Sequence, residues 1–177
     1  MAETRIPGKV KLIAGLIACD AELLSKVKRP LEKALDNKID FESVILDFVH
    51  TDYYEKEMGT DLKRVFFGFK DNISLESIYR VKIATNAIEK KFMVSGRRAV
   101  NIDPGYLDLS KLVLFSTKDF IHRIYLAKGI YAETTLFFKD HTFNHWPWTY
   151  PDYRTKEYIE IFNDLRNMYK VESRSSI

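Results

Sequence analysis

The stretch "KVKLIAGLIACD", residues 9–20, sets the pattern on which the rest of the fold is built. The apolar run over residues 9–18 predicts a buried strand. Asp20 comes directly after it, and because aspartate is a preferred N-cap residue we expect a helix to begin there. Apolar side chains recur on one side of this helix as far as Leu35. Pro30 is expected to kink or split the helix, since proline removes a backbone hydrogen bond.

Strand and helix patterns continue to alternate after this first unit. Residues 41–49 and 62–70 predict two strands, and a short turn of helix that ends at Gly59 lies between them. Residues 74–94 carry apolar side chains at steps of three and four, which predicts the clearest helix of the chain. Residues 97–102 then predict a fourth strand.

The resulting order is β-α-β-β-α-β, the pattern of a ferredoxin-like core, so the fold class that we expect is α+β. Asp103-Pro104-Gly105 predicts a type II turn directly after the fourth strand. An amphipathic segment (residues 109–115), an added C-terminal β-hairpin, an aromatic stretch and a terminal helix follow. We expect a single domain over residues 1–170 and a disordered tail over residues 171–177.

Composition and charge narrow the class of protein. The chain is 46% hydrophobic and 14% aromatic, which is typical of a folded globular protein. The net charge of +3, with no run of basic residues, makes a nucleic-acid partner unlikely. Cys19 is the single cysteine, so it can form no internal disulfide. The N-terminal apolar stretch is shorter than the roughly 20 residues that a membrane span needs, so we expect a soluble, cytoplasmic protein without a membrane partner.

The stretch "STKDFIHRIYLAKGIYAETTL", residues 116–136, predicts a hairpin dense in polar side chains. A three-residue loop with Gly129 in the left-handed conformation pairs Arg123 with Glu133 and Tyr125 with Tyr131. A two-residue loop shifts the pairing by one residue and mixes the polar and apolar faces, so the pattern favours the first register. The apolar face is then expected to hold the residues in the following list: Ile124, Leu126, Ile130, Ala132 and Leu136.

Two interpretations of this hairpin remain open. One is a cross-strand salt bridge beside a tyrosine pair, as many sheets contain. The other is a binding site in which Lys118 and Arg123 hold an anion. Tyr125 and Tyr131 would also contact the ligand in that site. The proton or metal chemistry of the site is assigned to Asp119, Glu133 and His122, although His122 falls on the apolar side.

Polar residues also follow the second and fourth predicted strands, which run in the same direction and so end at the same end of the sheet. The expected strand order puts these strands at opposite edges, roughly 14 Å apart. Side chains would have to bridge the middle to form one site. His50 stands beside the candidate ligand-binding residues Asp52, Tyr53 and Asp103. The alternative is that Thr51 or Asp52 caps the short helix and Asp103 begins its turn.

Several familiar motifs are missing or weak. The chain contains neither a G-x-x-x-x-G-K-[ST] loop nor a G-x-G-x-x-G loop. "DHTFNH", residues 140–145, holds metal-ligand residue types, but the Trp-Pro that follows makes a helical geometry doubtful. "KRVFFGF", residues 63–69, lies where RNA-recognition domains carry stacking aromatics, although core packing explains it better. "WPWTYPDY", residues 146–153, suits a stiff connector over apolar surface, a pocket wall or an oligomer contact.

Five stretches carry a resemblance to a known family: "VKLIAGLIACD", "HTDYYEKEMG", "KIATNAIE", "RRAVNIDPGYLDLSKLVLFSTKDFIHRIYLAKGIYAETTL" and "WPWTYPDY". Together they resemble the prokaryotic domain-of-unknown-function family 4416, whose members have about the same length. The resemblance covers nearly the entire chain and implies no established reaction. Some relatives carry a "GTP-binding" label, which the missing phosphate loop does not support. Pro30 and His50 depart from the expected pattern.

The function that the residues favour is binding, and conceivably turnover, of a small anionic ligand, phosphorylated or a nucleotide, at the 116–136 hairpin. An interaction or regulatory module that forms a homodimer is the alternative, and RNA binding is a weaker one. The cofactor is unknown. A divalent metal is compatible with these residues but no motif indicates one.

Overall fold

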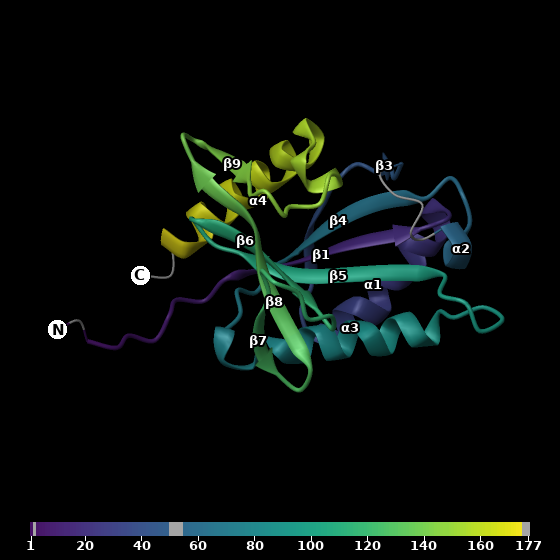
Figure 1. Ribbon diagram of the computed structural model, residues 1–177, viewed down its shortest axis with the longest axis horizontal. Coiled ribbons are helices and arrows are strands. Elements are labelled where there is room, and N and C mark those ends of the chain that lie inside the picture. The colour runs from purple at the N-terminus through teal and green to yellow at the C-terminus, as the bar shows by residue number, and fades with distance from the viewer. Residues whose placement is uncertain (2, 50–54, 175–177) are drawn as a thin grey trace.

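Strand β1 (Lys11–Ala18) lies inside the sheet, between β4 (Lys63–Phe69) and β5 (Val100–Leu107). All eight of its residues are buried, because helices cover both faces of the sheet there (Figure 1). The computed structural model describes residues 1, 3–49 and 55–174. Within them the sheet runs β2-β4-β1-β5-β6-β8-β7, and every pairing is antiparallel. The protein is therefore α+β with one large antiparallel sheet.

The remaining elements complete this sheet and its two covering layers. The other strands are β2 (Ile39–Glu42), β3 (Leu46–Asp47), β6 (Lys111–Ser116), β7 (Ile124–Ala127), β8 (Ile130–Lys139) and β9 (Thr142–His145). The helices are α1 (Ala21–Leu35), α2 (Glu55–Met58), α3 (Tyr79–Lys91) and α4 (Lys156–Arg174), with 3₁₀ turns at Leu75–Ser77 and Asp152–Arg154. No helix among the described residues has the length and apolar character that crossing a membrane requires.

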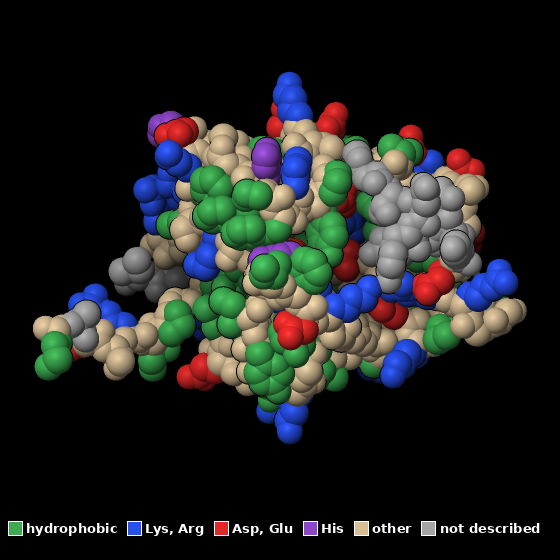
Figure 2. All heavy atoms as spheres, viewed as in Figure 1, with side chains coloured by type: hydrophobic (Ala, Val, Ile, Leu, Met, Phe, Trp, Pro, Cys, Tyr) green, Lys and Arg blue, Asp and Glu red, His purple; other side chains and the backbone are tan. Residues whose placement is uncertain are grey.

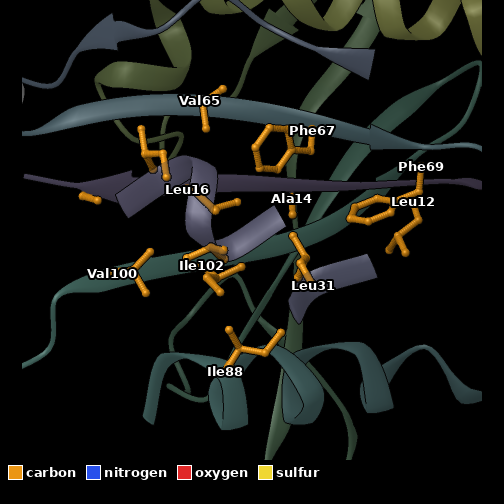
Figure 3. Packing of buried hydrophobic residues seen from close by; sticks show 13 residues of the cluster. Leu12, Ala14, Leu16, Leu31, Val65, Phe67, Phe69, Ile88, Val100 and Ile102 are labelled. Atoms are coloured by element: carbon orange, nitrogen blue, oxygen red, sulfur yellow. The ribbon is translucent and has the colours of Figure 1, made fainter. Parts of the chain in front are cut away.

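The two faces of β1 feed two different cores. Leu12, Ala14 and Leu16 pack with α1 and α3 on one face, as Figure 3 shows. Ile13 points to the opposite face, where Phe66 and the residues of α4 form a second core. Figure 1 shows α1 and α3 below the sheet and α4 above it. Alternation along a strand accounts for this division, since successive side chains point to opposite faces.

Helix α1 begins as expected and differs in its middle. The Asp20 carboxylate accepts a hydrogen bond from the backbone N–H of Leu23 at 2.6 Å, which confirms the predicted N-cap. Of the two expected effects of Pro30, a kink or a split, the split is wrong, because α1 continues through the proline to Leu35. Val27 and Leu31, on either side of the proline, are fully buried in the core. Their packing stabilises the helix despite the backbone hydrogen bond that the proline removes.

The single strand expected over residues 41–49 is also wrong, because two short strands, β2 and β3, replace it. Val44 and Ile45 lie between them and are exposed. Ser43 holds this break against β4, since its hydroxyl accepts a hydrogen bond from the Phe66 N–H at 2.9 Å.

The expected type II turn at residues 103–105 does not exist, because β5 runs straight through it to Leu107. Gly105 allows the next strand to approach, since a Cβ built at this position would lie 2.2 Å from the carbonyl oxygen of Val113 on β6. Pro104 is tolerated because it lies where β5 has already parted from β6. Strand β5 is therefore not the edge strand that we expected, and the amphipathic segment after it forms β6.

Strands β5 and β6 pair over only three residues of each, Gly105–Leu107 against Leu112–Leu114. Beyond that point β5 pairs only with β1, while β6 continues beside β8. Figure 1 shows β6 and β8 turning away from the direction of β1, β4 and β5. The sheet consequently splits, and the split faces α3.

The hairpin reaches one predicted pairing by an unexpected route. Its loop has two residues, Lys128 and Gly129, both with positive φ, instead of the three expected. A register shift beside Leu126 then restores the predicted pairing of Tyr125 with Tyr131.

The faces of the hairpin also differ from the expectation. Ile124 is 73% exposed, whereas Glu133 is only 3% exposed. Ile130 on β8 is buried as predicted. The cause is that β7 is the last strand of the sheet, outside the core, while β8 is sandwiched between β6 and β7.

The expected tail does not begin at residue 171, because α4 extends to Arg174. Glu172 on this last turn pairs with Lys11 at 2.7 Å. Lys11 lies on β1, is fully buried and also pairs with Asp40 at 2.7 Å. A buried ammonium needs such partners, and this requirement helps to hold the end of α4 on the sheet. Residues 175–177 lie outside the described residues.

Candidate functional site

A cleft of about 570 Å³ opens where β5 and β6 part. Its wall includes side chains from β1, β4, β5, α3 and β6, from the β7–β8 hairpin and from residues 150–153. In Figure 2, acidic and basic side chains lie side by side in a hollow to the right of the centre. The cleft is therefore built from segments that are distant in sequence and that meet only in the folded chain.

Arg64 forms the back of the cleft. Its side chain is 2% exposed, and its guanidinium donates to Asp103 at 3.1 Å and to Asp152 at 3.2 Å. It also donates to the hydroxyl of Tyr153 at 3.2 Å. Gly15 on the neighbouring strand leaves space for Phe66 and Arg64, since a Cβ there would lie 2.9 Å from the Phe66 ring and 3.3 Å from the guanidinium.

The charges in this network hold one another in the ionised form. Burial lowers the pKa of Arg64, but the surrounding tyrosines and carboxylates outweigh burial and place the pKa well above its ordinary value. Burial raises the pKa of Asp103, but Arg64 and Lys82 outweigh it, so this pKa lies below its usual range. At neutral pH both groups are charged, and the ion pair joins β4 to β5.

Helix α3 supplies the side of the cleft next to the open edge of β5. The Lys82 ammonium donates to the carbonyl oxygen of Ile102 at 2.8 Å, and the Glu89 carboxylate accepts from the Ile102 N–H at 2.6 Å. These two side chains replace the strand partner that β6 no longer provides. Burial raises the pKa of Glu89 above its usual range, despite the opposing effect of Lys82.

The hairpin supplies the opposite side. One carboxylate oxygen of Glu133 accepts from Arg123 at 2.6 Å and lies 3.0 Å from the His122 ring nitrogen Nε2. The second oxygen, Oε1, is buried and has no hydrogen-bond partner among the described residues. Arg123 also donates to Ser116 at 3.1 Å and to the Tyr150 hydroxyl at 2.8 Å. Arg123 thus links β6, the hairpin and residues 146–153, which we call the aromatic connector.

His122 is held between this carboxylate and aromatic rings. Its ring stacks on Trp148 with centroids 5.6 Å apart, and Trp148 stacks on Trp146 at 5.2 Å. The prediction that His122 lies on an apolar side is correct only for the ring face, because its Nε2 edge contacts Glu133.

The structure brings together some of the residues that the sequence singled out and not others. Lys118, Arg123, Glu133 and Asp103 line the cleft, and His122 reaches it through Glu133. Asp119 is exposed on the turn before β7 and is not part of the wall. Tyr125 and Tyr131 are not part of the cleft wall, and their rings pack edge to face on the hairpin with centroids 5.4 Å apart. The other candidates, His50, Asp52 and Tyr53, lie outside the described residues.

Sequence reasoning missed Arg64, Lys82, Glu89 and Asp152. Arg64 could have been noticed as a charge inside an otherwise apolar buried strand. Lys82 and Glu89 are seven residues apart, a spacing that places both on one face of α3. Asp152 gave no comparable signal, because its importance depends on Arg64.

The structure also bears on three weaker interpretations: RNA stacking by the aromatic residues of β4, metal binding, and a pocket wall formed by residues 146–153. Phe66, Phe67 and Phe69 on β4 are fully buried in the cores, so this strand presents no exposed stacking platform. Among the described residues no group of three or more His, Cys, Asp or Glu side chains could hold a metal ion. Tyr150 and Tyr153 of the aromatic connector line the cleft, and Tyr153 also packs in the core.

Comparison with known proteins gives one match. The family described as "Domain of unknown function (DUF4416)" matches residues 8–169. No curated protein and no solved structure matches the chain.

Proposed function

The chain belongs to the family "Domain of unknown function (DUF4416)", and we propose that it binds a small anionic ligand, a phosphorylated compound or a nucleotide, in the cleft beside the hairpin. The cleft volume of about 570 Å³ is of the size that small-molecule sites have, roughly 300–1,000 Å³. The family description states no activity, so the argument rests on the side chains of the cleft.

The observation that carries the proposal is the state of Lys82. Its side chain lies in the cleft wall, the residue is 7% exposed, and within the described residues its ammonium has one hydrogen bond, to the Ile102 carbonyl. A lysine ammonium has three donors, so two remain for a ligand. Glu89 and Asp103 lie near enough to interact with this charge, but among the described residues no carboxylate accepts a hydrogen bond from the ammonium, and an anion in the cleft would use its remaining donors. Phosphate is the common anion that lysine binds as a point charge.

Further basic residues line the same cleft. Lys118, Arg123 and Arg98 come from the turn before β7, the hairpin and the segment before β5. Arg98 is paired with Glu57 at 2.6 Å, and Arg123 with Glu133. Their positive charge balances the carboxylates of the wall, so that the phosphate need not face an excess of negative charge.

In this proposal, any turnover of the ligand depends on Glu133. Its Oε1 is buried in the cleft wall without a hydrogen-bond partner in the part of the chain that the structure describes, and Arg123 and His122 fix the other carboxylate oxygen. A fixed carboxylate with a free oxygen is the arrangement that a general base needs. In this proposal His122 orients Glu133, and Asp119 takes no part because it is exposed and away from the wall.

We also propose that the first part of the sheet, with α1 and α3, is a ferredoxin-like core. The order β2-β4-β1-β5, all antiparallel and with α1 and α3 on one face, supports a ferredoxin-like core that β6–β9 extend. In this arrangement the cleft lies at the junction between that core and the extension. The fold alone does not indicate a ligand.

A thermal-shift screen tests the proposed binding. The probes are inorganic phosphate, sugar phosphates, nucleotides and magnesium, each with wild-type protein and with Lys82→Met. Ligand at about 100 times its dissociation constant should add roughly 2.7 kcal/mol to the free energy of unfolding. Absence of any shift across the panel, or an equal shift in Lys82→Met, would contradict the proposal.

A second candidate function, a homodimerising module, is favoured by the surface at the end of the sheet. Ile121 is 94% exposed, Ile124 73% and Phe120 64%. Figure 2 shows hydrophobic side chains on the surface over the region where Figure 1 places β7 and β8. Strand β7 ends the sheet, and an edge strand can pair with the same strand of a second copy across a two-fold axis. Size-exclusion chromatography with light scattering measures the mass of the protein in solution. A dimer mass supports this candidate and a monomer mass rejects it.

A further inference from the structure

Besides the Nε of Arg64, two buried polar atoms of the cleft wall lack hydrogen-bond partners among the described residues. They are Oε1 of Glu133 and Nδ2 of Asn101, and the two residues are 3% and 4% exposed. More than nine in ten buried polar groups in proteins are hydrogen-bonded, so two exceptions in one cleft call for an explanation. Arg64 Nε is a third such atom of the wall, but its guanidinium lies over the ring of Phe66, 5.1 Å from the ring centroid.

The two atoms require opposite partners. Glu133 Oε1 can only accept a hydrogen bond while the carboxylate is ionised, and Asn101 Nδ2 can only donate one. The orientation of the Asn101 amide is set by Arg98, whose Nη1 donates to the Asn101 oxygen at 2.8 Å. The amide nitrogen carries two hydrogens: it acts on the nearby Asp103 carboxylate, whose pKa it lowers, and a second hydrogen remains for a ligand.

The charge of Glu133 limits the kind of donor that it can take. Arg123 already pairs with this carboxylate at 2.6 Å, so the negative charge is balanced within the protein. A second cation from the ligand would add a buried positive charge without a further counter-ion, which is costly. A neutral donor fits better. A hydroxyl group is neutral and both donates and accepts, so one type of ligand group satisfies both Glu133 and Asn101.

We propose that the ligand is a phosphorylated sugar of the ribose phosphate type, whose hydroxyl groups bond to Glu133 and Asn101 while its phosphate meets Lys82. This inference rests on the proposed function, because it adds hydroxyl recognition to the phosphate binding in the same cleft. A free pentose phosphate and the ribose phosphate part of a nucleotide share this chemistry. The cleft volume of about 570 Å³ has room for either.

Calorimetric titration of the wild-type protein tests hydroxyl recognition directly. The probes are ribose 5-phosphate and n-pentyl phosphate, which share a phosphate ester and five carbons but differ in their hydroxyl groups. We expect ribose 5-phosphate to bind at least about ten-fold more tightly, because hydrogen bonds to a charged group are among the stronger ones. Equal affinities would overturn the inference and leave phosphate binding intact. Failure of both esters to bind would contradict the proposed function as well.

Adenosine 5′-monophosphate distinguishes the two sources of the sugar. Binding more tightly than ribose 5-phosphate indicates a nucleotide, and weaker binding indicates a free sugar phosphate. Either result supports the inference as long as n-pentyl phosphate binds more weakly than both.

Two variants locate the contacts. Glu133→Gln and Asn101→Ala should each lower the affinity for ribose 5-phosphate about ten-fold and change that for n-pentyl phosphate by less than about two-fold. An equal loss for both esters would overturn the inference. Should Glu133→Gln fail to fold because Arg123 loses its counter-ion, Asn101→Ala and the wild-type comparison still decide the question.

Discussion

Arg123 and Glu133 form an ion pair at 2.6 Å between Nε and Oε2, and both side chains are less than a tenth exposed although the strand after Arg123 lies on the surface. The pair combines the two interpretations that the sequence left open. It is a cross-strand salt bridge, and it is also part of the cleft wall. The second oxygen of Glu133, which has no hydrogen-bond partner within residues 3–49 and 55–174, is what separates this pair from an ordinary structural pair.

Breaking this pair from one side should be costly. We expect Arg123→Met to lower the free energy of unfolding by about 3 kcal/mol, because it leaves a buried carboxylate without its counter-ion. The double variant Arg123→Met/Glu133→Leu should recover part of that loss, since both charges are then removed. Urea denaturation of wild type, Arg123→Met, Glu133→Leu and the double variant gives the coupling energy of the pair by a double-mutant cycle. Arg97→Met, at an exposed arginine, is the control. Additive effects of the two substitutions would show that the pair is not coupled.

Lys82 should matter for binding as well as for stability. Lys82→Met leaves the buried Ile102 carbonyl without its donor, so we expect this variant to fold with a free energy of unfolding lowered by about 1–3 kcal/mol. The stabilisation by a bound phosphate ester should disappear in this variant. Lys90→Met, at an exposed lysine of the same helix, should keep it. Loss of binding in Lys90→Met as well would argue against a specific role for Lys82.

The Arg64–Asp103 pair should make the protein sensitive to acid. The pKa of Asp103 lies below its ordinary value of 3.8, because Arg64 and Lys82 outweigh the effect of burial. A carboxyl group with a lowered folded-state pKa contributes stability that is complete above about pH 3.8 and is lost as the pH falls through the folded-state pKa. We therefore expect the stability difference between wild type and Asp103→Asn to shrink at low pH.

Chemical denaturation at pH 6, 4 and 3 measures this difference. Glu89, whose pKa is raised mainly by burial, gives both proteins a pH dependence opposite in sign to that of Asp103. Because Asp103 is only a lesser cause of the Glu89 shift, the Glu89 contribution largely cancels in the comparison. A difference that stays constant from pH 6 to pH 3 would show that Asp103 does not titrate through its pairing with Arg64.

Gly105 should tolerate no side chain. A Cβ at this position would lie 2.2 Å from the backbone oxygen of Val113, and a backbone atom cannot rotate away as a side chain can. We expect Gly105→Ala to lower the free energy of unfolding by at least about 2 kcal/mol. Gly8→Ala is the matched control, because its Cβ would meet nothing within 4 Å. Equal stabilities of the two variants would mean that β5 and β6 separate more easily than their close contact indicates.

The exposed apolar surface at β7 should decide the oligomeric state. If a second copy pairs with this strand, the wild-type protein elutes as a dimer and Ile124→Lys elutes as a monomer, since a charge at the edge opposes pairing. Val44→Lys is the comparison variant, because this exposed valine lies between β2 and β3, at the other end of the sheet. A wild-type monomer at all concentrations, by chromatography with light scattering, would reject the dimer.

Local pattern was sufficient for much of the secondary structure. The apolar run of β1, the N-cap at Asp20 and the order of the first strands and helices depend on neighbouring residues, and the structure confirms them. The pairing of Tyr125 with Tyr131 was also predictable, although the structure reaches it with a two-residue turn and a register shift. Polarity alone does not predict such a turn. The shorter loop moves the pairing by one residue and the register shift beside Leu126 moves it back, so the same residues face each other as in the predicted hairpin.

Contacts between distant residues decided the rest. Proline and glycine at positions 104 and 105 indicated a turn, yet they occupy a strand because β6 approaches closely and then departs. The sequence placed Glu133 on the polar face of the hairpin, whereas in the structure β6, the hairpin and residues 146–153 surround it. Polarity patterns indicate which side chains prefer water, but not which of them find a charged partner and can be buried.

The sequence by itself therefore determined strands β1 and β4, the helices α1, α3 and α4, and the membership of the chain in its family. Only the tertiary structure decided where the cleft lies and which charges line it. Arg64 and Asp152 are 88 residues apart in the chain and 3.2 Å apart in the fold. The physical reason is that an ion pair depends on distance in space, whereas a sequence pattern records only distance along the chain.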